Sequence, residues 1–206
     1  MSYQKKRAEQ SRSAILQAAE ELFLDNGYSI SLETIRLRSG VSKATLFSHF
    51  ANKQSLFFSV VEAMGARETV RIVAPLDAQG DYLDNLMDFL GRFTTAVVTK
   101  AGSGLYRLAV LEAHRFPEIA SGEYREGMGK ILPLVAAFLE RGQAQGVVRA
   151  DDAAMLAEQL IAAALGYRQY RILLGFDADQ STNDAYVRSA IIGVLTSDGI
   201  AAWNAV

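Results

Sequence analysis

The stretch SLETIRLRSGVSKATLFSHFANKQSLFF, residues 31–58, decides the fold of the N-terminal part of this chain. Its pattern is a short helix that ends at Gly40, a second helix capped by Ser42, and a third that begins at Asn52. The second helix starts with the small, polar and basic residues Lys43, Ala44 and Thr45. Such a helix can approach the base edges of the DNA major groove closely. The stretch therefore predicts a DNA-reading helix-turn-helix.

We expect nine side chains of this region to contact DNA: Arg12, Thr34, Ser42, Lys43, Ala44, Thr45, Phe47, His49 and Lys53. Lys43 and Lys53 can neutralise phosphates, and Thr45 can donate to a base or place its methyl group against thymine. Phe47 and Phe50 have a competing interpretation, because aromatic residues at helical spacing usually pack in a core. His49 is a candidate phosphate donor, and the alternative is a surface or packed histidine.

The charge of the chain is distributed unevenly. The net charge is −2 overall, yet residues 1–60 hold eight Lys and Arg against five Asp and Glu, which leaves the remainder at −5. A basic end on an acidic body is typical of a chain whose basic end meets a polyanion. The charge asymmetry is modest, so it supports the helix-turn-helix interpretation but would be weak evidence alone.

Helical periodicity recurs along almost the whole chain, which has only three prolines. An apolar stripe over residues 15–23 ends at Asn26-Gly27, and a boundary is expected at residues 71–80. Beyond it the pattern predicts helices near 81–100, 104–115, 121–145, 151–175 and 182–197. We predict an all-α fold of about nine helices, with a three-helix helix-turn-helix domain over residues 1–58 and a larger helical domain over 59–206.

Composition excludes several classes of protein. Cysteine is absent, which fits a reducing cytoplasm, and neither His49 nor His114 has a partner at metal-ligand spacing. No nucleophile–base pattern is recognisable, so we expect no enzyme, no metal and no cofactor. The basic start has no apolar segment behind it, and no apolar run reaches the length of a membrane span. We therefore expect a cytoplasmic protein without a membrane partner.

The run of residues 31–57 resembles the DNA-binding domain of TetR-type transcriptional regulators. The shared features are the Gly40-Val41-Ser42 turn and the pattern His49-Phe50-x-x-Lys53-x-x-Leu56-Phe57, within a match over about residues 8–60. Residues 107–129, RLAVLEAHRFPEIASGEYREGMG, resemble the C-terminal domain of an AefR-like subgroup. The resemblance implies a homodimer with a ligand-binding and dimerisation domain over residues 59–206. Such proteins are usually repressors that a small molecule releases from a DNA operator.

Two residues depart from the family pattern. The family usually has alanine four residues before the turn glycine, where two helices cross, and this chain has Arg36. Its charged head must extend outward over its methylene stem, or the crossing must widen. The family usually has tyrosine where this chain has Phe47, which lacks a phosphate-binding hydroxyl. Some affinity could then come from Arg36, Arg38 or the basic run at residues 5–7.

The C-terminal body offers an interface and a candidate pocket. The predicted helix at 153–174 is apolar on more than one face, and the helix at 182–197 adds further apolar residues, so a homodimer through these last two helices is expected. A small apolar or amphipathic ligand would suit the aromatic and soft residues of the body. These candidates are Phe89, Phe93, Tyr106, His114, Phe116, Tyr124, Met128 and Tyr167. For each of them, ordinary core packing is the competing interpretation.

Two other functions compete with a ligand-controlled regulator. One is an all-α enzyme or lipid carrier with an incidental helix-turn-helix, against which the missing catalytic pattern argues. The other is an architectural DNA-binding protein without a ligand, whose DNA affinity no metabolite would change. The sequence leaves the effector, the operator and the direction of regulation open.

Overall fold

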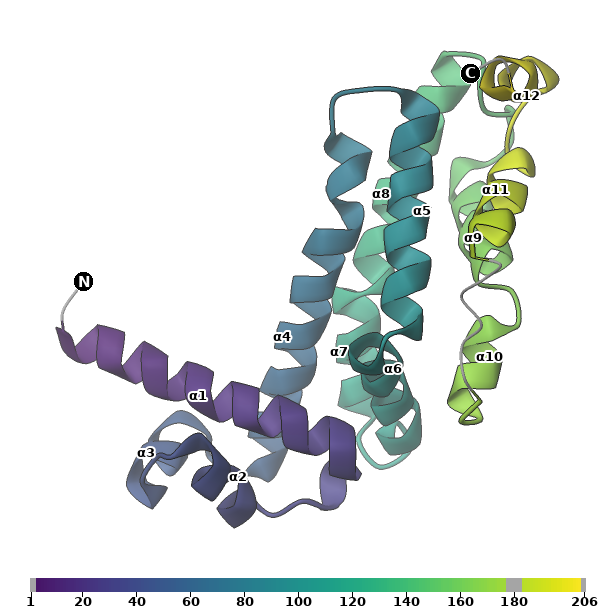
Figure 1. Ribbon diagram of the computed structural model, residues 1–206. Helices are drawn as coiled ribbons and strands as arrows, with labels where there is room; N and C mark the ends of the chain where they lie inside the picture. The colour runs from purple at the N-terminus through teal and green to yellow at the C-terminus, as the bar shows by residue number, and fades with distance from the viewer. Residues whose placement is uncertain (1–2, 177–182, 205–206) are drawn as a thin grey trace. The chain divides into compact units, whose positions relative to one another are not determined.

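The computed structural model describes residues 3–176 and 183–204. Within these ranges the chain forms helices and connecting loops, and the single β feature is an isolated bridge between Val148 and Leu195 (Figure 1). The all-α prediction is confirmed. The elements in chain order are α1 (Tyr3–Asn26), η1 (Gly27–Ser29), α2 (Leu32–Ser39), α3 (Lys43–His49), α4 (Lys53–Val73), η2 (Ala74–Asp77), α5 (Tyr82–Val98), α6 (Lys100–Glu112), α7 (Pro117–Glu126), α8 (Met128–Ala144), α9 (Ala153–Leu165), α10 (Arg168–Leu173), α11 (Asn183–Ile192) and α12 (Ser197–Asn204).

Several predicted helices are broken into shorter ones, which raises their number. The predicted helix at 121–145 is two helices, α7 and α8, separated at Gly127, whose φ of −100° and ψ of −106° are not helical. The predicted helix at 151–175 is also two, because Gly166 ends α9 with φ +53° and ψ −145°. Glycine lacks a Cβ and adopts this backbone readily. Helix α12 has no counterpart in the sequence prediction, and residue 182, the first of the predicted last helix, lies outside the described residues.

The helices divide into two compact units by their internal contacts. The first is the chain up to Gly65 together with Gly104–Glu123, and the second is Ala66–Ser103 together with the chain from Tyr124 onward. Helices α4, α6 and α7 therefore contribute residues to both units. The functional division at residues 58 and 59 stays a prediction from the sequence.

The first unit is built around α1, which contacts both α2 and α3 (Figure 1). Its apolar stripe faces the buried side of the helix-turn-helix, and Phe23 meets Phe57 edge to face at 4.8 Å between ring centroids. Each fully buried side chain of this size contributes roughly 1.5–3 kcal/mol. The buried apolar residues of this core are Ile15, Ala18, Ala19, Phe23, Ile35, Leu46, Phe50, Leu56 and Phe57.

The second unit has a continuous apolar core contributed by α5, α8, α9 and α11. In α5 the buried residues Leu86, Phe89, Leu90 and Phe93 recur at the spacing of one helical face. Tyr82 stacks on Phe138 at 4.4 Å and donates its hydroxyl to the Phe138 carbonyl at 3.2 Å. None of the helices in the described residues is long and apolar enough to cross a bilayer.

Candidate nucleic-acid interface

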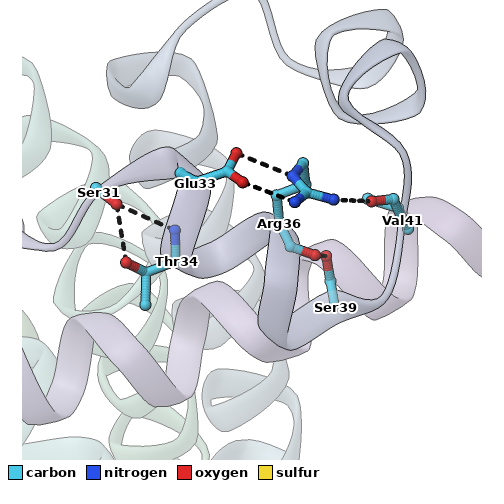
Figure 2. Close-up of polar contacts among 6 residues, drawn as sticks. All are labelled: Ser31, Glu33, Thr34, Arg36, Ser39 and Val41. Atoms are coloured by element: carbon cyan, nitrogen blue, oxygen red, sulfur yellow. Dashed lines mark hydrogen bonds and ion pairs between the residues drawn. The ribbon is translucent and has the colours of Figure 1, made fainter.

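Helix α2 is defined by local hydrogen bonds at both of its ends. Ser31 caps it by accepting the Thr34 backbone N–H at 3.0 Å, and the two hydroxyls lie 2.8 Å apart (Figure 2). At the other end Gly40 has φ +70°, and its N–H donates to the Arg36 carbonyl at 3.1 Å. This left-handed cap turns the chain sharply into the next helix. The predicted turn at Gly40 is thus confirmed, and the cap at Ser31 is an additional finding of the structure.

Helix α3, the expected recognition helix, starts in the same way. Ser42 accepts the Thr45 backbone N–H at 3.1 Å, and its hydroxyl lies 2.8 Å from the Thr45 hydroxyl. Leu46 and Phe50 are buried, whereas Lys43, Ala44 and Phe47 are exposed. The helix therefore presents its small and basic start to solvent. Phe47 is 45% exposed, so core packing does not account for it.

The Arg36 side chain bonds to two residues of the motif, Glu33 in α2 and Val41 in the turn (Figure 2). Its Nε and Nη2 donate to the Glu33 carboxylate at 2.9 and 2.6 Å, and its Nη1 donates to the Val41 carbonyl at 3.2 Å. The Arg36 side chain is 25% exposed and that of Glu33 is 61% exposed. The hydrogen bonds from Arg36 lower the pKa of the Glu33 carboxylate. The charged head of Arg36 thus meets an exposed acid, as expected for a side chain that extends outward over its stem.

The other arginine of α2 is also paired within the protein. Arg38 donates from Nε and Nη2 to one oxygen of Glu21 in α1, at 3.2 and 2.8 Å. Both side chains are well exposed. Arg38 thus links α1 to α2 and does not hydrogen-bond to the turn between α2 and α3. By contrast, Lys5, Lys6 and Arg7 are exposed in the first turns of α1.

Lys53, at the start of α4, lies over an aromatic ring. Its Nζ is 4.3 Å from the centroid of Tyr28, and the Arg115 guanidinium carbon is 5.2 Å from the same centroid. Partial burial lowers the pKa of Lys53, and repulsion from Arg115 adds to this. Phe116 packs edge to face on Tyr28 at 4.8 Å. The sequence analysis missed Tyr28 and Arg115, because their proximity to Lys53 depends on contacts between distant segments.

The remaining predicted DNA-contact residues also lie in the first unit. Arg12 is exposed on α1, with its guanidinium carbon 5.3 Å above the Phe50 ring. His49 is half-buried at the end of α3, and its ring lies 6.3 Å from that of Phe50. Thr34 is exposed beside Ser31. All nine residues thus belong to the one compact unit that contains the helix-turn-helix.

The eight ligand candidates are spread over both units. Phe89 and Phe93 stack at 6.2 Å inside the second core, where Met128 packs against the same cluster. Tyr106, His114 and Phe116 belong to the first unit, and His114 is exposed there. Tyr124 and Tyr167 are 56% and 82% exposed. The structure therefore places Phe89, Phe93 and Met128 in or against the same apolar cluster, and the other five candidates are not part of it.

Two further observations limit the chemistry of the molecule. An open hollow of about 280 Å³ lies beside α1 and α2, lined by residues that include Glu21 and Arg38, and it contains none of the ligand candidates. Among the described residues no group of three or more His, Cys, Asp or Glu side chains could hold a metal ion.

Comparisons with known proteins agree with this geometry. Residues 15–60 match the family described as bacterial regulatory proteins, tetR family. Residues 84–196, more than half of the chain, match the domain described as AefR-like transcriptional repressor, C-terminal domain. This chain belongs to the TetR family of transcriptional regulators. The family resemblance read from the helix-turn-helix and from residues 107–129 is confirmed.

Relatives of this TetR-family regulator cover almost its full length. It is 25% identical to the HTH-type transcriptional regulator UidR of Escherichia coli K12, over 92% of this chain and 95% of UidR. Among solved structures, the flavonoid-responsive regulator FrrA is 27% identical, with a TM-score of 0.71 over 90% of this chain and 95% of FrrA. A TetR-family regulator from Mesorhizobium loti shares the fold at a TM-score of 0.81 and 21% identity, over 91% of this chain and 96% of that one. These proteins are regulators, which confirms that this TetR-family chain is not an enzyme.

Proposed function

We propose that this TetR-family regulator is a homodimeric repressor that binds a near-palindromic DNA operator and is released from it by a small molecule. The observation that carries the proposal is the capped helix α3, which exposes Lys43, Ala44 and Phe47. Two such helices would enter successive major grooves about 34–36 Å apart, or a multiple of that distance. Because genomic DNA is the partner, the site of action would be the cytoplasm.

In this proposal the nine predicted residues divide into two roles. Arg12, Lys43, His49 and Lys53 would contact phosphates, together with the hydroxyls of Thr34 and Ser42. Ala44, Thr45 and Phe47 would face the base edges. Phe47 has no hydroxyl, so it would contribute apolar contact, for example with a thymine methyl group.

The homodimer is supported by apolar side chains left exposed on the last helices of the second unit. Tyr167, Tyr170, Leu174, Phe176, Tyr186 and Ile192 are each at least 39% exposed, on or beside α10 and α11. Helices α9 and α11 lie side by side (Figure 1). A cluster of exposed apolar residues of this size is typical of a protein interface. We therefore propose that these helices pair with those of a second copy.

Release by a ligand is supported by three observations. The matched C-terminal family is described as a repressor, and the relative FrrA is named as flavonoid-responsive. Phe89, Phe93 and Met128 contribute to one apolar core, and aromatic and soft side chains of this kind suit a small apolar or amphipathic molecule. Phe116, from the segment between α6 and α7, contacts Tyr28 in η1, which directly follows α1. Movement of that segment would reach the DNA-binding helices directly, with a typical coupling of ~1–3 kcal/mol.

The first test is a fluorescence-anisotropy titration with DNA from upstream of the protein's own gene. It is repeated with unrelated DNA and with a panel of small apolar molecules that includes flavonoids. We expect preference for the upstream DNA at physiological salt, and about 5- to 150-fold weaker binding with the right ligand. No sequence preference would refute a specific repressor. If the protein prefers the upstream DNA and no molecule in the panel changes its affinity, the result would favour an architectural DNA-binding protein without a ligand.

The second test separates the two roles within the interface. Lys53→Ala should weaken binding to every DNA sequence and lower the slope of log affinity against log salt by about one. Thr45→Val keeps the shape and removes the hydroxyl, so it should change base preference and leave the salt slope unaltered. Equal weakening on all sequences by both substitutions would contradict this division of roles.

A further inference from the structure

The turn between α2 and α3 is held from two sides. On one side the Gly40 N–H donates to the Arg36 carbonyl at 3.1 Å. On the other side the Arg36 Nη1 donates to the Val41 carbonyl at 3.2 Å. Val41 directly precedes Ser42, the residue that caps α3. A single residue of α2 thus contacts the turn through both its backbone and its side chain.

Glu33 holds the Arg36 guanidinium in place for this contact. The two side chains form two parallel hydrogen bonds of 2.9 and 2.6 Å, one turn apart on α2 (Figure 2). This pairing uses Nε and Nη2 and leaves Nη1 free to reach the Val41 carbonyl. Such a fork is a property of the planar guanidinium, and a lysine ammonium cannot reproduce it.

We propose that Arg36, oriented by Glu33, is a positioning residue that fixes the recognition helix α3 relative to α2 and thereby sets sequence specificity. The proposal rests on the proposed DNA-binding function. In this arrangement the guanidinium of Arg36 hydrogen-bonds to the Val41 carbonyl of the turn and does not contact a DNA phosphate. Base readout requires α3 to be aligned with the groove edges, whereas contact with phosphates tolerates a looser helix. Losing the bridge would therefore reduce binding to the operator more than binding to unrelated DNA.

The alternative role of Arg36 is a direct phosphate contact, and the two roles predict opposite results. Arg36→Lys keeps the positive charge and loses the fork. Glu33→Ala removes the acid and leaves Arg36 without its partner. A phosphate contact would tolerate the first substitution and would gain affinity from the second, because an acidic group near DNA disappears. A positioning role predicts weaker operator binding from both.

The chain contains a matched control pair on the same helix. Arg38 also donates two hydrogen bonds to an acid, at 3.2 and 2.8 Å to one oxygen of Glu21, but it does not bond to the α2–α3 turn. Arg38→Lys thus keeps the charge and loses the guanidinium hydrogen bonds, and Glu21→Ala removes the acid, without touching the α2–α3 connection. They report any effect that arises only from charge or from losing an exposed ion pair.

The experiment measures operator and non-operator affinities of the four variants at several salt concentrations. For Arg36→Lys and Glu33→Ala we expect the ratio of operator to non-operator affinity to fall about fivefold, which corresponds to one net hydrogen bond. The salt slope should stay unchanged, and the two control variants should keep the ratio of the unaltered protein. An unchanged ratio in Arg36→Lys, or tighter operator binding by Glu33→Ala, would overturn the proposal.

Hydrogen exchange in the free protein tests the same bridge without DNA. The Thr45 and Leu46 amides close the first turn of α3 on Ser42, at 3.1 and 3.0 Å. We expect both amides to exchange about fivefold faster in Arg36→Lys and Glu33→Ala, and at the original rate in the two control variants. Equal exchange in all variants would overturn the proposal even if the protein binds its operator. The outcome would be different if these amides exchange faster in the two variants but the unaltered protein shows no preference for any DNA sequence. The bridge would then be confirmed, and the proposed DNA-binding function would be wrong.

Discussion

Gly40 shows how a single residue shapes the DNA-binding unit. Its φ of +70° is a left-handed conformation that an L side chain adopts only with strain, although a Cβ would meet no atom within 4 Å. The constraint at this position is thus conformational and not steric. It is also local, which is why the residue can be recognised in the sequence as the end of a helix.

We expect Gly40→Ala to lower the free energy of unfolding by ~1–2 kcal/mol, because alanine must adopt the left-handed backbone. Gly91 lies inside α5 with open space around it, so Gly91→Ala should instead stabilise its helix by ~1 kcal/mol. Urea unfolding followed by circular dichroism measures both. A stabilising effect of Gly40→Ala would contradict the strain argument.

The Glu33 carboxylate makes the α2 bridge sensitive to acid. Its pKa in the folded protein lies below the ordinary value of 4.5 because Arg36 donates to the charged form. A lowered pKa means that the stabilisation is present above the unfolded value and is lost as pH falls through the folded one. Thermal unfolding should show that the unaltered protein loses stability below about pH 4.5, and that Glu33→Ala loses less. If both proteins lose the same stability in acid, Glu33 does not contribute to the acid sensitivity.

At the scale of elements, some helices end at residues where the sequence pattern predicted a continuous helix. Helix α9 ends at Gly166, and the next helix begins with Arg168, which is only 7% exposed. Its guanidinium donates to the Leu165 carbonyl at 3.2 Å, to the Ala164 carbonyl, and to the Asn183 side chain at 2.5 Å. Burial lowers the pKa of this arginine. Arg168 thus provides hydrogen-bond donors for carbonyls at the end of α9.

Helix α3 depends on its cap, and the cap can be separated from DNA contact. Ser42→Ala should lower the free energy of unfolding by about 1 kcal/mol, because the Thr45 N–H loses its acceptor. Ser42→Asp restores the acceptor and should recover that stability, yet it should weaken DNA binding because it places a negative charge beside the phosphates. Unfolding and anisotropy measurements on both variants check this. If Ser42→Asp binds DNA as tightly as the unaltered protein, Ser42 does not lie at the DNA interface.

At the scale of the whole molecule, the exposed apolar side chains of α10 and α11 are the feature that a single copy leaves unexplained. Exposing several tyrosines and aliphatic residues close together is unfavourable in water and is usually relieved by association. The proposed operator symmetry requires the same association. Dimerisation and DNA recognition should therefore depend on each other.

We expect Tyr170→Glu to convert the dimer to a monomer, because it places a charge in the proposed apolar interface. Tyr170 is 59% exposed in the single copy. Val70 in α4 is 71% exposed and lies outside this cluster, so Val70→Glu is the control. Sedimentation or light scattering gives the mass, and circular dichroism checks that the helices remain. A dimeric Tyr170→Glu protein, or a monomeric unaltered protein, would rule out this interface.

The sequence by itself determined the features that depend on neighbouring residues. The cap at Ser42, the turn at Gly40 and the apolar stripes of the helices each arise within a few residues, so their spacing was sufficient to predict an all-α chain with a DNA-reading motif. The candidate site residues of the helix-turn-helix could be named for the same reason.

Only the tertiary structure decided which partners the charged side chains take. Arg38 meets Glu21 from 17 positions away, Lys53 lies on Tyr28, and Arg115 reaches the same ring from a distant segment. The ligand candidates likewise separated: Phe89 and Phe93 are buried in one core, Met128 packs against it, and the others lie elsewhere. These contacts form when helices pack and depend on distances that no local pattern encodes. Arg36 lies between the two cases, because its Glu33 partner is local and its contact with Val41 required the folded turn.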